Sequence, residues 1–214
     1  MNRRLALAAA LLLTGCERHA APGPEPRPTA QPSPAPPVAS APAPSPTPAP
    51  MPTAAPLSAA DRLILGQWRK AANRGECAPL HFRSTAGASG TPRPARFSGG
   101  WAVAWDQPQV RSAFGIAGVA ILPDDHASAD AQRDRLARQW QHLRQLDTLP
   151  QPAFAGYGVE GAQPYPVTNP EGKGLNSLAY LRVGGQTCTY NVWSRISRAH
   201  LEALLENLEL LPTG

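Results

Sequence analysis

The chain has 214 residues and a formal net charge of +5. From Ser58 onward it carries sixteen lysines and arginines against thirteen acidic residues, and the two kinds are interspersed. Domains that bind nucleic acid gather Lys and Arg on one face or stripe, so this mixture argues against nucleic acid as a partner. Residues 58–214 have the length of one ordinary domain.

The first fifteen residues have the layout of a secretory signal. Arg3 and Arg4 precede an apolar run from Leu5 to Leu13, which small residues separate from Cys16. The run is too short for a membrane-spanning helix, which needs about 20 residues. An uncleaved N-terminal anchor and a buried helix are the alternative interpretations.

The sequence Leu13-Thr14-Gly15-Cys16, placed after this run, resembles the lipobox of bacterial lipoproteins. The resemblance implies that the signal peptide 1–15 is removed. Cys16 then becomes the first residue, with diacylglycerol on its sulfur and a third chain, such as palmitate, on its amino group. Two lipid signals already anchor a protein stably, so permanent attachment is expected. In this family Asp after the cysteine favours the inner membrane, so Glu17 predicts the outer membrane, with the domain facing the periplasm.

Residues 16–57 are expected to form the lipidated N-terminus and a disordered Pro/Ala-rich linker. Fifteen of the 26 prolines lie between residues 20 and 57. Such tracts adopt extended polyproline II conformations without packing a core, and at about 3.1 Å per residue this one would reach at most on the order of 120 Å. A proline-rich recognition ligand is the alternative, but the diffuse composition favours a spacer.

The folded region, residues 58–214, begins with a predicted helix and a predicted hairpin. Ser58 and Asp61 suit the start of the helix, and Gly75 suits its end. Residues 97–105 alternate bulky and small side chains, which is strand periodicity, and residues 112–122 predict a second strand.

The middle of the region predicts one helix between two irregular segments. Residues 84–96 are rich in Gly, Ser, Thr and Pro and predict a loop. Ser128 or Asp130 caps a helix that extends to about Leu146. Residues 148–176 are dense in proline and glycine, and so long a loop in a compact domain is either functional or conceals an element.

The closing unit predicts a hairpin and a helix. Residues 178–183 and 186–194 flank the turn Gly184-Gly185. The face expected to be buried consists of Ala179, Leu181, Val183, Cys188, Tyr190 and Val192. Ser197 caps a final helix whose leucines recur at helical spacing. The whole predicts an α+β fold, with an antiparallel sheet of about four strands in two hairpins, about three helices packed on it, and one disulfide.

Two cysteines remain once Cys16 is assigned to lipid, and in an oxidising compartment Cys77 and Cys188 are expected to form that disulfide. A catalytic or metal-binding thiol is the alternative. It is disfavoured because the chain has no CxxC motif, and neither cysteine has a histidine at ligand-like spacing.

The motifs that would indicate an enzyme are weak. Residues 156–161 match GxGxxG, but prolines surround the match and the expected strand and helix are missing. Asp124 and His126 precede a helix and could ligate a metal, although a helix-entry loop explains them equally well. His81, His142 and His200 are isolated in sequence, the last two on expected helices as surface or boundary residues. No cofactor and no metal site are therefore predicted.

Aromatic residues give the remaining candidates for a site. Trp193, Tyr157 and Tyr165 are possible contact residues, and the loop from Gly156 to Ser177 is the expected contact surface. Trp193 falls on the hairpin face opposite Cys188, and of the aromatic residues it is the one expected to be exposed or to lie under a helix.

Three functions follow from these observations. The first is a membrane-anchored envelope lipoprotein that presents a small non-enzymatic domain, binding an envelope protein or acting as an inhibitor or immunity-type protector. The second is an enzyme acting on peptidoglycan or another envelope substrate, with a cleft that gathers residues such as Glu160, Glu171, Asp124 and His126. The third is a small-ligand binding protein. The lack of a catalytic motif favours the first.

Overall fold

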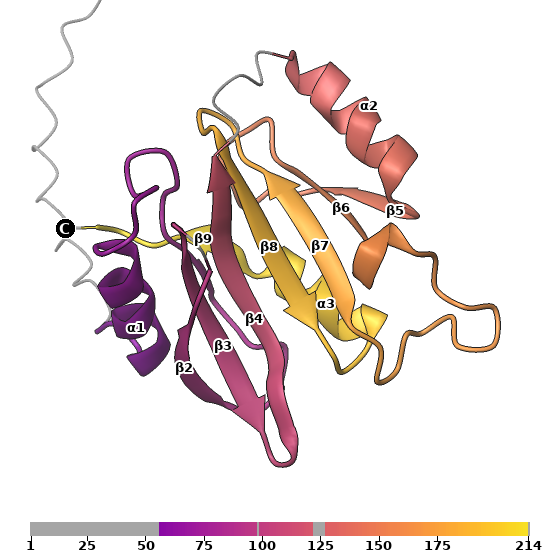
Figure 1. Cartoon of the computed structure of the whole chain (residues 1–214), viewed down its shortest axis with the longest axis horizontal. Helices are drawn as coiled ribbons and strands as arrows, with labels where there is room; N and C mark the ends of the chain where they lie inside the picture. The colour runs from indigo at the N-terminus through magenta and orange to yellow at the C-terminus, as the bar shows by residue number, and fades with distance from the viewer. Residues whose placement is uncertain (1–55, 98, 122–126, 214) are drawn as a thin grey trace, which may run out of the picture. The chain divides into compact units, whose positions relative to one another are not determined.

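The computed structural model describes residues 56–97, 99–121 and 127–213. Their elements are α1 (Ala59–Trp68), β1 (Leu80–Phe82), β2 (Thr91–Ala95), β3 (Trp101–Gln107), β4 (Val110–Ile121), α2 (Ala129–Gln139), β5 (His142–Gln145), β6 (Phe154–Val159), the short 3₁₀ turn η1 (Glu160–Ala162), β7 (Ser177–Arg182), β8 (Cys188–Ser194), α3 (Arg198–Glu206) and β9 (Leu208–Leu210) (Figure 1). The three predicted α-helices are confirmed in this part of the chain, although the first ends at Trp68 and not at Gly75. None of its helices is long and apolar enough to cross a membrane. Cys16 and the proline-rich tract up to residue 55 lie outside the described residues.

Seven strands form one antiparallel sheet in the order β2-β3-β4-β8-β7-β6-β5, while β1 pairs separately with β9. The antiparallel arrangement and the hairpins β3–β4 and β7–β8 are confirmed. The prediction of about four strands is wrong, because β2, β5 and β6 complete the sheet on its two sides. The pairing of β4 with β8 joins the two hairpins into one layer.

The unexpected strands β2 and β6 are rich in residues that usually interrupt strands. β2 contains Pro92 and Pro94, which cannot donate to a ladder but are tolerated because β2 is an edge strand. β6 contains Gly156 and Gly158, which the sequence assigns to a loop. Trp140 requires the first of them, since a Cβ atom on Gly156 would lie 2.6 Å from indole Cδ1. Gly156 and Gly158 therefore permit close packing of a strand, whereas Gly161, the third glycine of the GxGxxG match, lies in η1 with φ +76° and, among the described residues, nothing near it.

The second helix is shorter than expected. It ends at Gln139, and the backbone of Trp140 is already extended, with φ −112° and ψ 147°. His142 consequently lies on strand β5 and not on a helix. The apolar spacing of Leu136, Trp140 and Leu143 looks helical, but the packing of the Trp140 indole on β6 ends the helix before the third of them.

The β7–β8 hairpin differs from the expected one in register. A turn links Val183 to Gln186, and the ladder pairs Leu181 with Tyr190, whereas a two-residue turn would pair Leu181 with Cys188. The shift is two residues, and side chains alternate with period two. The faces are therefore as predicted, and all six residues of the expected buried face lie in the main core.

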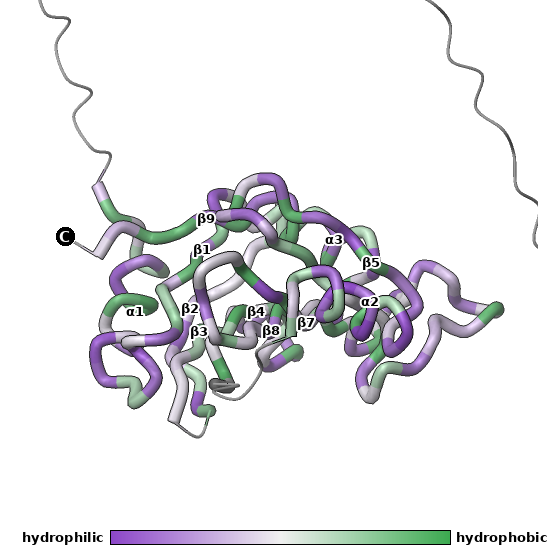
Figure 2. The backbone as a smooth tube through the Cα atoms, turned by 90° about the horizontal axis from the view of Figure 1, so that it is seen from above, coloured by the Kyte–Doolittle hydropathy of each residue, from purple (hydrophilic) through white to green (hydrophobic). Residues whose placement is uncertain are grey.

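One face of the sheet carries this main core, on which α1 and α3 pack together with β1 and β9. Figure 2 shows α3 and the β1–β9 pair on the same side of the sheet. The leucines of the final helix, Leu201, Leu204 and Leu205, are fully buried, as their spacing predicts. His200 is also buried, so its placement at the surface or boundary is wrong. Its Nδ1 lies 2.9 Å from the Ser194 hydroxyl, and its Nε2 lies 3.1 Å from the Thr85 carbonyl oxygen.

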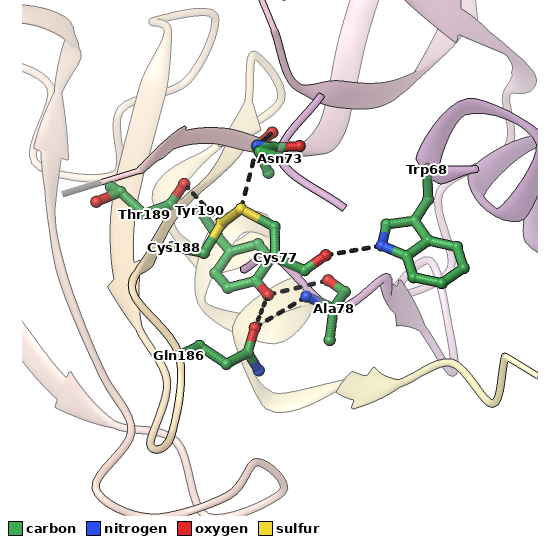
Figure 3. Close-up of a disulfide and its surroundings, with 9 residues drawn as sticks. Trp68, Asn73, Cys77, Ala78, Gln186, Cys188, Thr189 and Tyr190 are labelled. Atoms are coloured by element: carbon green, nitrogen blue, oxygen red, sulfur yellow. Dashed lines mark hydrogen bonds between the residues drawn. A yellow bond between two sulfur atoms is a disulfide. The ribbon is translucent and has the colours of Figure 1, made fainter. Parts of the chain in front are cut away.

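The disulfide between Cys77 and Cys188 is confirmed, and it joins the segment after α1 to the first residue of β8 across 111 positions (Figure 3). Hydrogen bonds hold this segment on both sides. Trp68 Nε1 donates to the Cys77 carbonyl oxygen at 2.8 Å, and the Tyr190 hydroxyl donates to the Ala78 carbonyl oxygen at 2.9 Å. The bridge thus ties the first helix to the middle of the sheet.

Candidate functional site

Among the described elements, a helix covers the opposite face of the sheet at one end only. There α2 contacts β6 and β5, and Leu136 and Trp140 pack against Phe154. In Figure 1 the strands β4, β8 and β7 face the viewer, while α3 lies behind them. The middle of the sheet on this side therefore presents side chains that no helix of the described chain covers.

Two adjoining hollows lie on this face. The first, with a volume of about 660 Å³, is lined by Gln132, Arg135, Leu136, Gln139, Trp140, Glu160, Gly161, Ala162, Leu178, Tyr180, Leu181, Arg182 and Thr189. The second, of about 580 Å³, is lined by Phe97, Arg111, Ser112, Glu160, Asn176, Leu178, Tyr180, Asn191, Trp193 and Arg195. Glu160, Leu178 and Tyr180 belong to both, so the hollows meet over β7. Together they are called the sheet groove below.

Trp193 forms the floor of the second hollow. Its indole lies across Gly115 on the neighbouring strand, and its Nε1 donates to the Ser112 carbonyl oxygen at 3.2 Å. Phe97 packs against it with ring centroids 6.2 Å apart, and 38% of Phe97 is exposed. The expectation that Trp193 lies on the face opposite Cys188 is met. The expectation that it is exposed or lies under a helix is not met, because only 9% of it is exposed and side chains of the sheet bury it.

Two arginines stand at one wall of the second hollow. Arg195 Nη1 donates to the Arg111 carbonyl oxygen at 3.5 Å, and both residues are exposed. The carboxylate of Asp106 binds other groups, Arg93 Nε at 2.7 Å and the Ser112 amide at 2.6 Å. These two hydrogen bonds, with smaller contributions from the charges of Arg93 and Arg111, hold the pKa of Asp106 below its ordinary value of 3.8. Within the described residues no carboxylate forms an ion pair with either Arg111 or Arg195.

The opposite wall is acidic and polar. Glu160 Oε2 accepts a hydrogen bond from Asn176 Nδ2 at 2.9 Å. Asn191, between the walls, is 8% exposed, and its Oδ1 has no hydrogen-bond partner in the part of the chain that the structure describes. A buried amide oxygen without a partner is costly, so an N–H or O–H group from a ligand would gain there.

The structure separates Tyr157 and Tyr165 from Trp193. Tyr157 belongs to the main core face, where its hydroxyl donates to Glu202 Oε1 at 2.8 Å. Burial, with the Glu202 carboxylate adding to it, raises the pKa of Tyr157 to about 12. Tyr165 is buried under the guanidinium of Arg198, 5.7 Å from its ring centroid. Both tyrosines thus hold the fold together beside α3.

The loop expected to be the contact surface is partly regular. Its first residues belong to β6 and η1. The remainder is fixed to the start of α3, because the Arg198 amide donates to the Glu171 carbonyl oxygen at 2.8 Å and the Gly174 amide to that of Ile196 at 3.2 Å. Val167, at 96% exposure, is the most prominent apolar side chain of this segment.

The remaining candidate residues are dispersed. His81 Nδ1 lies 2.8 Å from Asp61 Oδ1, a contact that links β1 to α1. Glu171 pairs with Lys173 at 2.8 Å and does not line the groove, whereas Glu160 does. Asp124 and His126 lie outside the described residues. Within residues 56–97, 99–121 and 127–213, no three His, Cys, Asp or Glu side chains are grouped as metal ligands.

Comparisons of the chain with models of protein families, with curated proteins and with solved structures found no match in any of the three. Function must therefore be argued from the groove itself.

The groove gathers aromatic side chains, a buried amide, and two arginines that form no ion pair with the described residues. These groups can bind a ligand by stacking, charge and hydrogen bonding. Sequence reasoning identified Trp193 as a candidate but not Arg111, Arg195 and Asn191, and the two arginines come together only when β4 pairs with β8. The alternation along the hairpin, which places Tyr180, Arg182, Asn191 and Trp193 opposite the buried residues, was the local signal for this face.

Proposed function

We propose that the chain is an envelope lipoprotein, anchored through Cys16, that presents its 58–214 domain as a non-enzymatic module for binding an envelope protein. The sheet groove is the binding surface. The observation that carries the proposal is the uncovered sheet face on which Phe97, Tyr180 and Trp193 stand beside Arg111 and Arg195. An inhibitor or immunity-type protector would use such a surface in the same way.

Residue type supports a protein partner. Tyr, Trp and Arg dominate the binding energy of protein interfaces, and they cluster where water is excluded. Here Trp193 is fixed by its hydrogen bond to the Ser112 carbonyl oxygen. A rigid aromatic anchor loses little conformational freedom on binding, which favours affinity.

The distribution of acidic residues gives no support to a hydrolytic enzyme. Among the described residues that line the two hollows Glu160 is the one acidic residue, and Asn176 already binds it. General acid–base cleavage of a glycan usually employs a pair of carboxylates. The groove is therefore better suited to holding a partner than to cutting one.

The proposal is tested by isolating complexes of the full-length chain from envelope membranes. Phe97→Ala should reduce recovery of the bound protein by about tenfold, the equivalent of 1.4 kcal/mol. Leu210→Ala is the matched control, because Leu210 is 39% exposed and lies on β9, away from the groove. Recovery of no specific protein, or equal losses in the two variants, would refute the proposal.

The first hollow favours a second candidate function, the binding of a small ligand. Its volume of about 660 Å³ falls within the range of about 300–1,000 Å³ that is usual for ligand pockets, and the Trp140 indole stands in its wall. Native mass spectrometry of the full-length chain checks this function. The native protein should carry the extra mass of a small molecule, and denaturation should release it.

A further inference from the structure

We infer that the partner presents an acidic extended segment to the second hollow, with a carboxylate against Arg111 and Arg195 and an apolar side chain against Trp193 and Phe97. This inference rests on the proposed function and adds the chemistry of the partner. It follows from charge, from the spacing of groups on β8 and from the two unlike walls of the hollow.

Charge is the first step. Other arginines of the described chain have acidic partners, such as Arg93 with Asp106 at 2.7 Å and Arg144 with Glu206 at 2.6 Å. Arg111 and Arg195 both line the second hollow, and neither forms an ion pair among the described residues; the charge of Arg111 is felt only weakly by Asp106, whose carboxylate binds Arg93. A carboxylate that enters this hollow can accept charge-assisted hydrogen bonds from guanidinium groups that no carboxylate of the described chain already binds.

An apolar contact surface, formed by the rings of Trp193 and Phe97, lies immediately beside these two arginines. Arg195 follows Trp193 by two residues in sequence, and Ser112, which follows Arg111, holds the Trp193 indole through its carbonyl oxygen. Phe97 offers an exposed ring against the same indole. One ligand can therefore place a carboxylate on the arginines and an apolar group on the aromatic rings at the same time.

Spacing indicates an extended peptide. Asn191 and Trp193 are alternate residues of β8 on one face, so they lie about 7 Å apart along the strand. An extended peptide has the same repeat between alternate residues. With an apolar side chain on Trp193, such a peptide runs past Asn191, whose amide oxygen lacks a partner among the described residues; that oxygen is buried, so the Asn191 side chain must turn to accept a hydrogen bond from the peptide.

The acidic wall restricts the ligand to one that carries discrete charges. Glu160 follows β6, two strands away from β8, so about 10 Å of sheet separates it from the arginine side. A uniformly anionic membrane surface or glycan polymer would bring negative charge against Glu160 as well. A peptide segment can instead carry its acid at one end only.

The experiment places a photo-crosslinking amino acid at position 97 of the full-length chain in its native envelope, and maps the captured peptides. Position 210 serves as the background control. Captured peptides are expected to carry Asp or Glu within a few residues of the crosslink. The double change Arg111→Glu/Arg195→Glu should lower the yield by about tenfold or more.

A matched control exists in a second pair of exposed arginines. Arg74 Nη1 donates to the Arg69 carbonyl oxygen at 3.2 Å, beyond the end of α1, so Arg69→Glu/Arg74→Glu changes the net charge equally. This variant should crosslink like the unmodified chain.

The outcomes separate the two claims. If position 97 captures nothing above the background at position 210, the proposed function itself is refuted. Capture of peptides without acidic residues, or yields that the charge reversal leaves unchanged, overturns this inference and leaves the proposed function standing. Crosslinks to glycan or lipid overturn the inference and assign the groove to another class of partner.

Discussion

Trp193 lies so closely over Gly115 that a Cβ atom on the glycine would overlap carbon Cζ2 of the indole. The two residues are direct partners in the β4–β8 ladder. Glycine is thus required at position 115 so that the indole can lie flat and form the floor of the second hollow. The floor of the groove depends on a backbone position on another strand.

Gly115→Ala should accordingly destabilise the protein. Overpacking of a filled site typically costs about 1–3 kcal/mol, and the indole must also shift. The expected result is a lower free energy of unfolding in denaturant titration, with a change in tryptophan fluorescence of the native state. Gly66→Ala is the control with the opposite sign, because nothing lies near that helical glycine and alanine favours a helix by about 0.5–1 kcal/mol. Equal stability of Gly115→Ala and the unmodified chain would contradict this account.

The elements that the sequence predicts correctly carry local signals. Ser58 and Asp61 form a capping box, with both hydrogen bonds at 3.0 Å, and Ser197 caps α3 through the His200 amide. The alternation of β7 and β8 sorts their side chains onto the correct faces even though the register is shifted by two. Caps and periodicity are properties of a few adjacent residues, so a sequence displays them directly.

The elements that the sequence conceals depend on tertiary contacts. The glycines of β6 suggest a loop until Trp140 is seen to lie on Gly156. The prolines of β2 are acceptable only because that strand is at the edge. Likewise, Arg111 and Arg195 are 84 residues apart, and no local pattern brings them together. The aromatic part of the groove was therefore partly predictable, through Trp193, and the charged part was not.

The disulfide should contribute much of the stability of the domain. In the chain-entropy model, a bridge that spans 111 residues stabilises by about 4–5 kcal/mol. Cys77→Ala/Cys188→Ala should lower the free energy of unfolding by this order, measured by urea titration. Reductant should destabilise the unmodified chain to a similar degree and leave the double variant unchanged. Two reactive thiols in the unreduced, unfolded domain would show that the bridge does not form.

The anchor is tested through the two residues at the expected cleavage site. Cys16→Ser removes the thiol that would carry the lipid, so the chain should remain unprocessed or become soluble in membrane fractionation. Glu17→Asp should move the lipidated chain from outer to inner membrane fractions, with its mass altered only by the substitution. If the chain without substitutions is soluble, the anchor is contradicted. If that chain is found in the inner membrane, the sorting prediction is contradicted.

His200 should make the stability of the domain depend on pH. Burial lowers the pKa of His200 below its ordinary value of 6.5, and its bond to the Thr85 carbonyl oxygen only partly opposes this shift. The unfolded chain therefore takes up a proton at higher pH than the folded chain does. This contribution to stability is fully present above pH 6.5 and is lost as the pH falls through the folded-state pKa.

The variant His200→Gln separates this titration from the packing role of the residue. It loses the hydrogen bonds to Ser194 and Thr85, so it should be less stable at neutral pH by about 1–3 kcal/mol. Its free energy of unfolding should nevertheless fall less steeply below pH 6.5 than that of the unmodified chain. His142→Gln is compared in the same titration. Burial and the Arg198 charge also lower the pKa of His142, so this variant should likewise show a free energy of unfolding that falls less steeply below pH 6.5. An unchanged slope in His200→Gln would show that the buried imidazole does not resist protonation.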